Sequence, residues 1–181
     1  TANISDTVLA NYAGLEGTGN VYTISIADAA IDADALVALN AKTTGTITLA
    51  GDTSISGTLA NVNTVLGGAG LASVAANLAI TVTDASITVA EADALSELTT
   101  GLVTATVAPG TLAANNAFAD SGGQVNNISF TVTDSTAAAA TLNALDAKTT
   151  VDIDVSAANA ISGAHADIVT LYGNTANFVS L

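Results

Sequence analysis

The sequence predicts an α/β protein built as an open repeat solenoid, in which alternating strand–helix half-units form a parallel sheet with helices on one side. Three observations predict this fold: a long internal repeat, strands whose apolar residues alternate with polar ones, and leucines at helical spacing. Composition agrees, because 50% of the 181 residues are hydrophobic while only three Phe and three Tyr are aromatic. Alanine and valine bury little area each, so the core must be extended and thin.

The repeat is visible in three stretches that align without a gap, each running from an aspartate to a Thr-Thr pair: residues 28–44, 84–100 and 134–150. Residues 28–68 and 134–174 are identical at 16 of 41 positions, which establishes the repeat. An asparagine also precedes each expected first strand, at Asn20, Asn77, Asn127 and Asn177.

These matches predict a single repeat array over residues 1–181, with a partial unit at 1–27 and units at 28–83, 84–133 and 134–181. Because the array starts and ends within a unit, we expect a window on a longer chain or the subunit of a fibre. The first residues lack the basic start and apolar run of a signal peptide, so mature or internal protein is expected.

Strands are predicted where apolar residues alternate with Thr, Ser or Asp, as in the segments 24–26, 46–49, 80–83, 103–107, 128–133 and 151–155. Such strands have one buried and one wet face. Strands and helices alternate at spacings of about 22 to 32 residues, which predicts parallel strands with right-handed crossovers. Because only one strand face is apolar, all helices should lie on that side of the sheet.

Helices are predicted from leucine pairs three residues apart, namely Leu36 and Leu39, Leu95 and Leu98, and Leu142 and Leu145. Thr88 with Glu91 has the spacing of a capping box, and Asp32 holds the equivalent position in the first copy. Ser56 and Ser162 are predicted to cap the second helices, which Gly67 and Gly173 would end. Lys42 and Lys148 are predicted to lie in the last turn of a helix, near its negative end.

The charge balance excludes several classes of function. The chain has 16 acidic residues, two lysines and no arginine, and its net charge is −14. Nucleic acids and anionic membrane surfaces would repel such a chain. No cysteine is present, so disulfides and thiolate sites are excluded, and no apolar run is long enough to predict membrane insertion.

Residues for catalysis are scarce, and we predict that the chain is not an enzyme, with no catalytic residue and no cofactor. His165 is the single histidine and has no cysteine partner. Neither a nucleophile elbow nor a phosphate-binding glycine loop is present.

Carboxylates give one candidate metal site. Asp152 and Asp154 would share the wet face of a strand, and calcium is the ion that such oxygens favour. Helix capping and solubility are the competing interpretation of the acidic residues, including Asp28, Asp84 and Asp134 at strand ends, and it is the preferred one.

Threonines give a candidate surface. Eight of them would form Thr-x-Thr rows on the wet face of the sheet, at Thr46, Thr48, Thr81, Thr83, Thr104, Thr106, Thr131 and Thr133. Neighbouring rows would be about 4.8 Å apart. Such a face resembles the ice-binding faces of some β-solenoid proteins, although threonine is also a common exposed strand residue. It could instead belong to an adhesin or ligand-binding module, as could the divergent segment 109–124.

Several segments, among them DADALVALNAKTTGTITL, ISGTLANVNTVLGG and ITVTDASITVAEADALSELTTGLVTATV, resemble repeats of very large secreted surface proteins of bacteria, cyanobacteria especially. The resemblance covers roughly residues 4–181 and implies an extracellular or cell-surface role as a structural repeat, in a filament, a surface layer or cell adhesion. Many such proteins also carry calcium-binding repeats, but the Gly-Gly-x-Gly-x-Asp pattern of those repeats is missing here.

Both ends of a solenoid expose strand edges that favour further pairing. The expected function is therefore a structural segment of an extracellular protein or filament that assembles end to end. Its partners would be copies of itself or adjacent repeats, with glycan or a cell surface as further candidates. The expected assembly edge comprises Phe178, Val179, Ser180, Leu181 and Ile4.

Overall fold

The computed structural model shows an α/β protein with parallel sheets, and it describes residues 2–67, 71–72, 75–119 and 126–181. The chain forms two compact units, Thr1–Asp84 and Ala85–Leu181. The α/β class and the parallel pairing are confirmed, whereas the single sheet expected from the sequence is replaced by several short ones.

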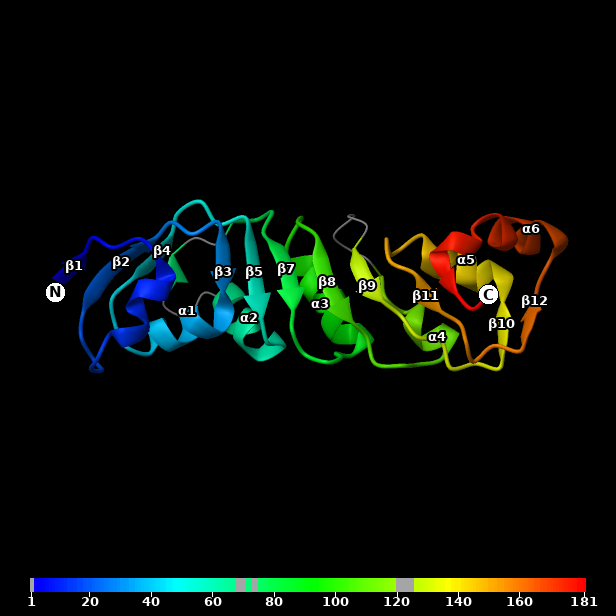
Figure 1. Ribbon diagram of the computed structural model, residues 1–181, viewed down its shortest axis with the longest axis horizontal. Coiled ribbons are helices and arrows are strands. Elements are labelled where there is room, and N and C mark those ends of the chain that lie inside the picture. The colour runs from blue at the N-terminus through cyan, green and yellow to red at the C-terminus, as the bar shows by residue number, and fades with distance from the viewer. Residues whose placement is uncertain (1, 68–70, 73–74, 120–125) are drawn as a thin grey trace. The chain divides into compact units, whose positions relative to one another are not determined.

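In the first unit the chain winds through two rows of parallel strands and one row of helices (Figure 1). The first row is β1 (Ala2–Ile4), β2 (Tyr22–Ile26), β4 (Ile47–Leu49) and β6 (Leu71–Ala72). The second row is β3 (Ala30–Asp32), β5 (Ser54–Gly57) and β7 (Ala79–Val82). The helices are the 3-10 helix η1 (Leu9–Gly14), α1 (Ala33–Asn40) and α2 (Leu59–Leu66).

We call each passage of the chain through strand, strand and helix a winding. Ile24 pairs with Ile47 and Ile31 pairs with Ile55, so a winding takes 23 or 24 residues at these points. The predicted strand–helix half-unit corresponds to this winding, except that each winding has two strands instead of one.

The second unit repeats this order from β9 onward, whereas β8 is the one named strand between α3 and α4. It contains α3 (Val89–Leu98), β8 (Val103–Thr106), α4 (Leu112–Asn115), β9 (Asn127–Ser129), β10 (Thr136–Ala138), α5 (Ala139–Asp146), β11 (Ile153–Asp154), β12 (Ala160–Ser162), α6 (His165–Gly173), η2 (Thr175–Asn177) and β13 (Phe178–Val179). Strand β8 pairs with β9, β10 with β12, and β11 with β13, all in parallel. A single bridge between Thr131 and Asp154 joins the β9 segment to β11.

Corners between the two strands of a winding explain why one continuous sheet does not form. Residues 27–29 separate β2 from β3, and residues 50–53, which include Gly51, separate β4 from β5. Gly51 has φ 103°, a left-handed conformation that most side chains disfavour. The chain therefore changes direction at Gly51, before it enters β5 and buries Ile55.

The core is a narrow column of aliphatic side chains, as the composition predicts. The winding from β2 to α1 illustrates it: its buried residues are Ile24, Ile26, Ile31, Ala33, Leu36 and Leu39. All three sides of the winding contribute to this set. Stacking one winding on the next is what removes these side chains from water.

Helix positions follow the sequence predictions at most points. Asp32 caps α1 by accepting from the amides of Asp34 and Ala35, and Thr88 with Glu91 forms the predicted capping box on α3. Both leucines of the first and third predicted pairs are buried. The second pair is wrong in part, because Leu98 is 53% exposed at the end of α3 while Leu95 is buried.

The predicted caps of the second helices are wrong. Ser56 lies in β5 and Ser162 lies in β12, because each strand continues to pair past the position where a helix was expected. Thr58 caps α2 instead, and α6 begins after Ala164, which provides no side-chain cap. Gly67 does end α2, whereas Gly173 is the last residue of α6.

Both lysines lie just past a helix end instead of in its last turn. Lys42 follows α1, and Lys148 follows α5. Lys148 donates from Nζ to the carbonyl oxygens of Asn116 and Phe118 at 2.8 and 2.7 Å. It therefore serves the C-terminal end of α4, a helix of the neighbouring winding, where a cation is favourable.

Candidate functional site

The strand-end aspartates of the repeat connect neighbouring windings. In three places a helix's first amide donates to a carboxylate of the following winding: Leu9 N to Asp28 Oδ2 at 2.7 Å, Leu59 N to Asp84 Oδ2 at 2.6 Å, and Leu112 N to Asp134 Oδ2 at 2.5 Å. A carboxylate at a helix N-terminus satisfies an amide that has no intrahelical partner and interacts favourably with the helix dipole. Helix capping, the preferred interpretation of these aspartates, describes their contacts, but the helix they cap belongs to another winding.

This contact recurs at every second winding. Asp28, Asp84 and Asp134 are 56 and 50 residues apart, whereas a winding takes 20 to 25 residues across the described pairings. Helices α1 and α3, which lie between, are capped by Asp32 and Thr88 of their own segments. The alternation explains why the sequence repeats every two windings.

The Thr-Thr pairs at the other end of the repeat also join windings. Thr43 Oγ1 accepts from the amide of Tyr22 at 2.9 Å, and Thr149 Oγ1 donates to the carbonyl of Ile128 at 2.7 Å. Both threonines are buried at 7% exposure. Because a buried hydroxyl must be hydrogen-bonded, these positions are fixed by the stacking of windings.

A further acidic contact makes stability depend on pH. The pKa of Asp34 is lowered, chiefly because Asn61 Nδ2 donates to Oδ1 at 2.7 Å, while desolvation opposes the effect. A carboxyl whose folded-state pKa is depressed stabilises the fold above its unfolded pKa and loses that contribution as the pH falls through the folded value.

We therefore predict that stability declines below about pH 4 and that Asp34→Asn makes this decline shallower. The measurement is urea unfolding of both proteins between neutral and acidic pH. The amide introduced by the substitution keeps an oxygen for Asn61 but cannot ionise. Identical acid slopes for the two proteins would contradict the role of this carboxylate.

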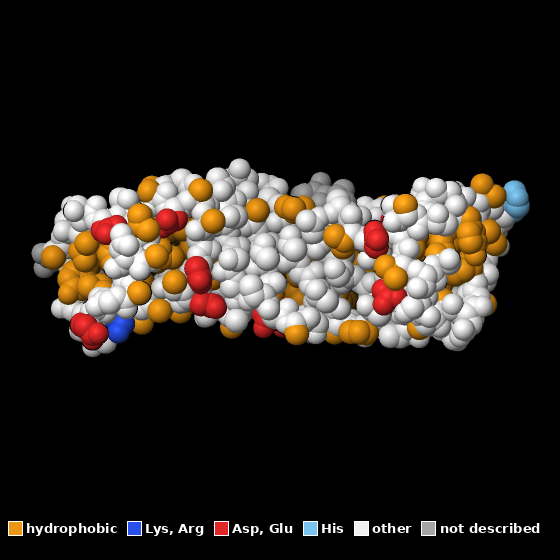
Figure 2. Space-filling view, viewed as in Figure 1, with side chains coloured by type: hydrophobic (Ala, Val, Ile, Leu, Met, Phe, Trp, Pro, Cys, Tyr) orange, Lys and Arg blue, Asp and Glu red, His pale blue; other side chains and the backbone are white. Residues whose placement is uncertain are grey.

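Apolar side chains of the winding that contains β12 and α6 are more exposed than their counterparts in the winding that contains β5 and α2. Ile161 follows Ile55 by 106 positions, and Ile168 follows Val62 by the same distance. Ile55 and Val62 are 1% and 0% exposed, but Ile161 and Ile168 are only half-buried. Figure 2 shows apolar side chains gathered over β12 and α6. This face is the candidate functional site.

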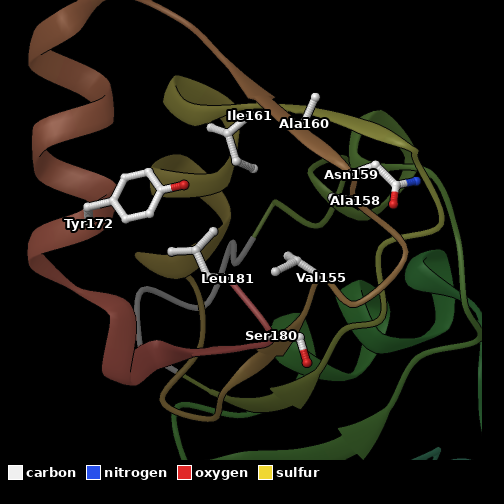
Figure 3. Close-up of a pocket in the computed structure, with 8 residues that line it drawn as sticks. All are labelled: Val155, Ala158, Asn159, Ala160, Ile161, Tyr172, Ser180 and Leu181. Atoms are coloured by element: carbon white, nitrogen blue, oxygen red, sulfur yellow. The ribbon is translucent and has the colours of Figure 1, made fainter.

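A pocket of about 210 Å³ opens beside β12. Figure 3 shows Ile161 of β12, Tyr172 of α6 and Leu181 around it. Tyr172 is 53% exposed although its ring is mostly apolar. Five of the eight lining residues are aliphatic, Asn159, Tyr172 and Ser180 carry polar groups, and none is charged.

The predicted assembly-edge residues lie in different environments. Phe178 is only 6% exposed and belongs to the core, whereas Val179 is 46% exposed and Leu181 lines the pocket. Ser180 has φ 63° and is exposed. Ile4 is half-buried in β1, which is an edge strand of its sheet. The structure thus brings Ser180 and Leu181 together and places Ile4 in the other unit.

The predicted threonines are distributed over several sheets. Within each unit the residues paired with them are Ser25 and Ala72 beside Thr48, Ser56 beside Thr81, Asn127 beside Thr104, Ser129 beside Thr106, and Asp154 beside Thr131. Thr46, Thr83, Thr131 and Thr133 lie outside the named strands. Inside each unit these pairings do not favour a flat threonine lattice.

The candidate calcium residues lie at β11. Asp152 is exposed, and Asp154 Oδ1 accepts from the Ser156 amide at 2.9 Å, which lowers the pKa of Asp154. Among the described residues no group of three or more His, Cys, Asp or Glu side chains could hold a metal ion. His165 is the first residue of α6 and its side chain is exposed. The segment 109–124 contains α4, and its residues 120–124 lie outside the described part.

Sequence reasoning missed Ile161 and Tyr172 as surface residues. The alignment of residues 28–68 with 134–174 contained the signal, since it pairs Ile161 with Ile55, which a later winding covers. Reading that signal requires knowing which strand covers Ile55, and the sequence alone leaves this pairing open.

Comparison of the chain with protein-family models, with curated proteins and with solved structures finds no match. In the part of the chain that the structure describes, the helices are too short or too polar to cross a membrane.

Proposed function

We propose that this chain is a structural repeat segment of an extracellular bacterial surface protein or filament, and that it assembles end to end through its strand edges. The observation that carries this proposal is the contrast between two equivalent windings. Strand β7 pairs with β5 and leaves Ile55 buried, whereas Ile161 in the equivalent strand β12 is half-buried beside an open pocket. A further winding would cover it as β7 covers β5.

Each unit is built from the same kind of winding, and we propose that each is an open solenoid with its helices on one side. Helix pairs α1–α2 and α5–α6 pack side by side within their units. Stacks of this kind gain stability from nearest-neighbour interfaces, so they can extend without any change in the winding. The next winding comes from adjacent repeats or from another copy of the chain.

Edge strands support this mechanism. Strand β1 is at one edge of its sheet, and β12 and β13 are at edges of theirs. An edge strand presents unpaired backbone groups that pair with another strand unless charge, proline or a covering segment prevents it. Ala160, Ile161 and Ser162 of β12 include neither a charged residue nor a proline.

An extracellular location fits the chemistry of the chain. It has no cysteine or methionine, so oxidation of sulfur cannot damage it. The net charge of −14 favours solubility of an array with little aromatic content. We propose a scaffolding role with no catalytic step.

The proposal predicts that Val179→Glu combined with Leu181→Glu abolishes end-to-end assembly, because two carboxylates would enter an apolar junction. Sedimentation velocity and electron microscopy across a concentration series measure the effect. Leu102→Glu is the matched control, since Leu102 is 39% exposed and lies in an inner winding. Assembly of the double variant at the wild-type concentration would contradict the proposal.

A further inference from the structure

We propose that the edge of β12 and the N-terminus of α6 form a docking site for an extended peptide strand with a defined pattern. The strand carries alternating apolar and polar residues and then an aspartate two positions after its last inward apolar residue. The inference rests on the proposed function, because such a strand would belong to the next winding of the array. The inference names the groups that recognise that winding, which are the edge of β12 and the first amide of α6.

The template for this site lies in the first unit. There, β7 pairs in parallel with β5, with Ile80 opposite Ile55 and Val82 opposite Gly57. Leu78 and Ile80 are 1% and 0% exposed. Two residues after Val82, the Asp84 carboxylate accepts from the amide of Leu59, the first residue of α2, at 2.6 Å.

The same receiving surface recurs 106 positions later. Ile161-Ser162-Gly163 repeats Ile55-Ser56-Gly57, and His165 occupies the place of Leu59 as the first residue of its helix. Gly57 and Gly163 both approach the preceding winding closely: a Cβ on either would lie 2.8 or 3.3 Å from the Cβ of Ala33 or Ala139. The residue before each helix is extended in both places, Thr58 at φ −64° and ψ 149° and Ala164 at φ −68° and ψ 151°. Gly163 differs from Gly57 in its positive φ of 152°.

The two surfaces differ in what covers them. Helix α6 has Ala164 before it, with no side-chain cap, and among the described residues no carboxylate accepts from the His165 amide. Every other helix of this alternating series, η1, α2 and α4, receives an aspartate from the next winding. The aspartates bound at η1, α2 and α4 indicate that the N-terminus of α6 accepts an aspartate as well.

Asp167 is the one acidic residue in the first turn of α6, and it stands where α2 has Asn61. A second carboxylate near the helix N-terminus weakens attraction for an incoming aspartate. Asp167→Asn should therefore tighten binding about threefold, as the loss of one exposed like-charge contact predicts.

The test uses a synthetic peptide with the sequence of residues 77–86, NLAITVTDAS, which contains β7 and Asp84. Its partner is the full chain at concentrations below those at which it assembles, followed by NMR. We expect shifts at Ile161, Tyr172 and the His165 amide. The peptide with Asp84→Asn should bind about tenfold more weakly, because it loses a charge-assisted hydrogen bond.

Two variants of the chain at His165 distinguish binding through its backbone amide from binding through its imidazole. His165→Pro removes the amide hydrogen at a position where proline is well tolerated, and Ala164 is already extended at φ −68° and ψ 151°, as a residue before proline must be. His165→Ala keeps the amide. The proline variant should weaken wild-type peptide binding about tenfold and bind both peptides equally, while the alanine variant should retain the preference for aspartate.

Several outcomes would overturn the docking site: no shifts at about 1 mM peptide, equal binding of the Asp and Asn peptides to the unaltered chain, or shifts centred on Val179 with none at Ile161. The proposed function is tested separately by microscopy of the chain alone. Filaments without peptide binding would reject the site and leave the function. Specific peptide binding by a chain that never assembles would reject assembly and leave the site.

Discussion

Phe130→Ala is expected to lower the free energy of unfolding by about 3 to 5 kcal/mol, the usual cost of a large-to-small change in a core. Phe130 is 1% exposed, and its ring centroid lies 5.9 Å from that of Phe118, which is fully buried. Most other core side chains are Ala, Val, Ile or Leu, and a rigid stack of windings has few ways to close the resulting cavity. Urea unfolding followed by circular dichroism measures the loss.

Val169→Ala is the matched control in the same unit. Val169 is 58% exposed, so its truncation should change the free energy of unfolding by less than about 0.5 kcal/mol. A loss below about 1 kcal/mol for Phe130→Ala would show that the aromatic pair is not part of a close-packed core.

Lys148→Met is expected to cost about 2 to 3 kcal/mol of stability, the typical effect of removing a charged donor from several acceptors. Lys148 Nζ donates to Asn116 O, Asn116 Oδ1 and Phe118 O at 2.8, 2.9 and 2.7 Å. Asn116 is the C-cap of α4 and Phe118 follows it by two residues, so these oxygens lie at the negative end of the helix. Methionine keeps the length of the side chain but supplies no hydrogen.

Lys42→Met provides the control, because Lys42 holds the same place in the repeat 106 positions earlier. Lys42 is half-buried, and its side chain donates no hydrogen bond to another residue that the structure describes. Its replacement should cost less than about 1 kcal/mol. Equal losses for the two variants, measured by thermal unfolding, would contradict the role given to the Lys148 contacts.

The sequence predicts the windings well because their signal is local and repeated. Ile24 and Ile26 alternate with polar residues in β2, and Leu36 and Leu39 mark one face of α1, so each element is recognisable within a few positions. The repeat of 106 residues also predicts that equivalent segments share a structure. The parallel direction of the strands follows because a helix intervenes between successive windings.

The corners and caps were harder to predict because tertiary pairing decides them. Ile31 is the only inward residue of β3, and a three-residue strand carries too little alternation to recognise. Both Ser56 and Thr58 are reasonable caps for α2, and the pairing of Ser56 with Thr81 excludes the first. Lys148 bonds to Asn116, 32 residues away, which no local pattern indicates.

The candidate site was predicted in part. Val179 is exposed, as the predicted assembly edge requires, but Phe178 belongs to the core because it pairs with Ile153 in β11–β13. The acidic residues illustrate the same limit. Their capping role follows from spacing and composition, but the identity of the capped helix depends on which winding stacks against which.

Cryo-electron microscopy of the native, unfragmented assembly tests the central proposal most directly. We predict filaments in which strands about 4.8 Å apart continue across every junction, with density covering Ile161 and a carboxylate at the first turn of α6. Isolated particles, or filaments in which β12 faces solvent at each junction, would contradict end-to-end assembly through the strand edges.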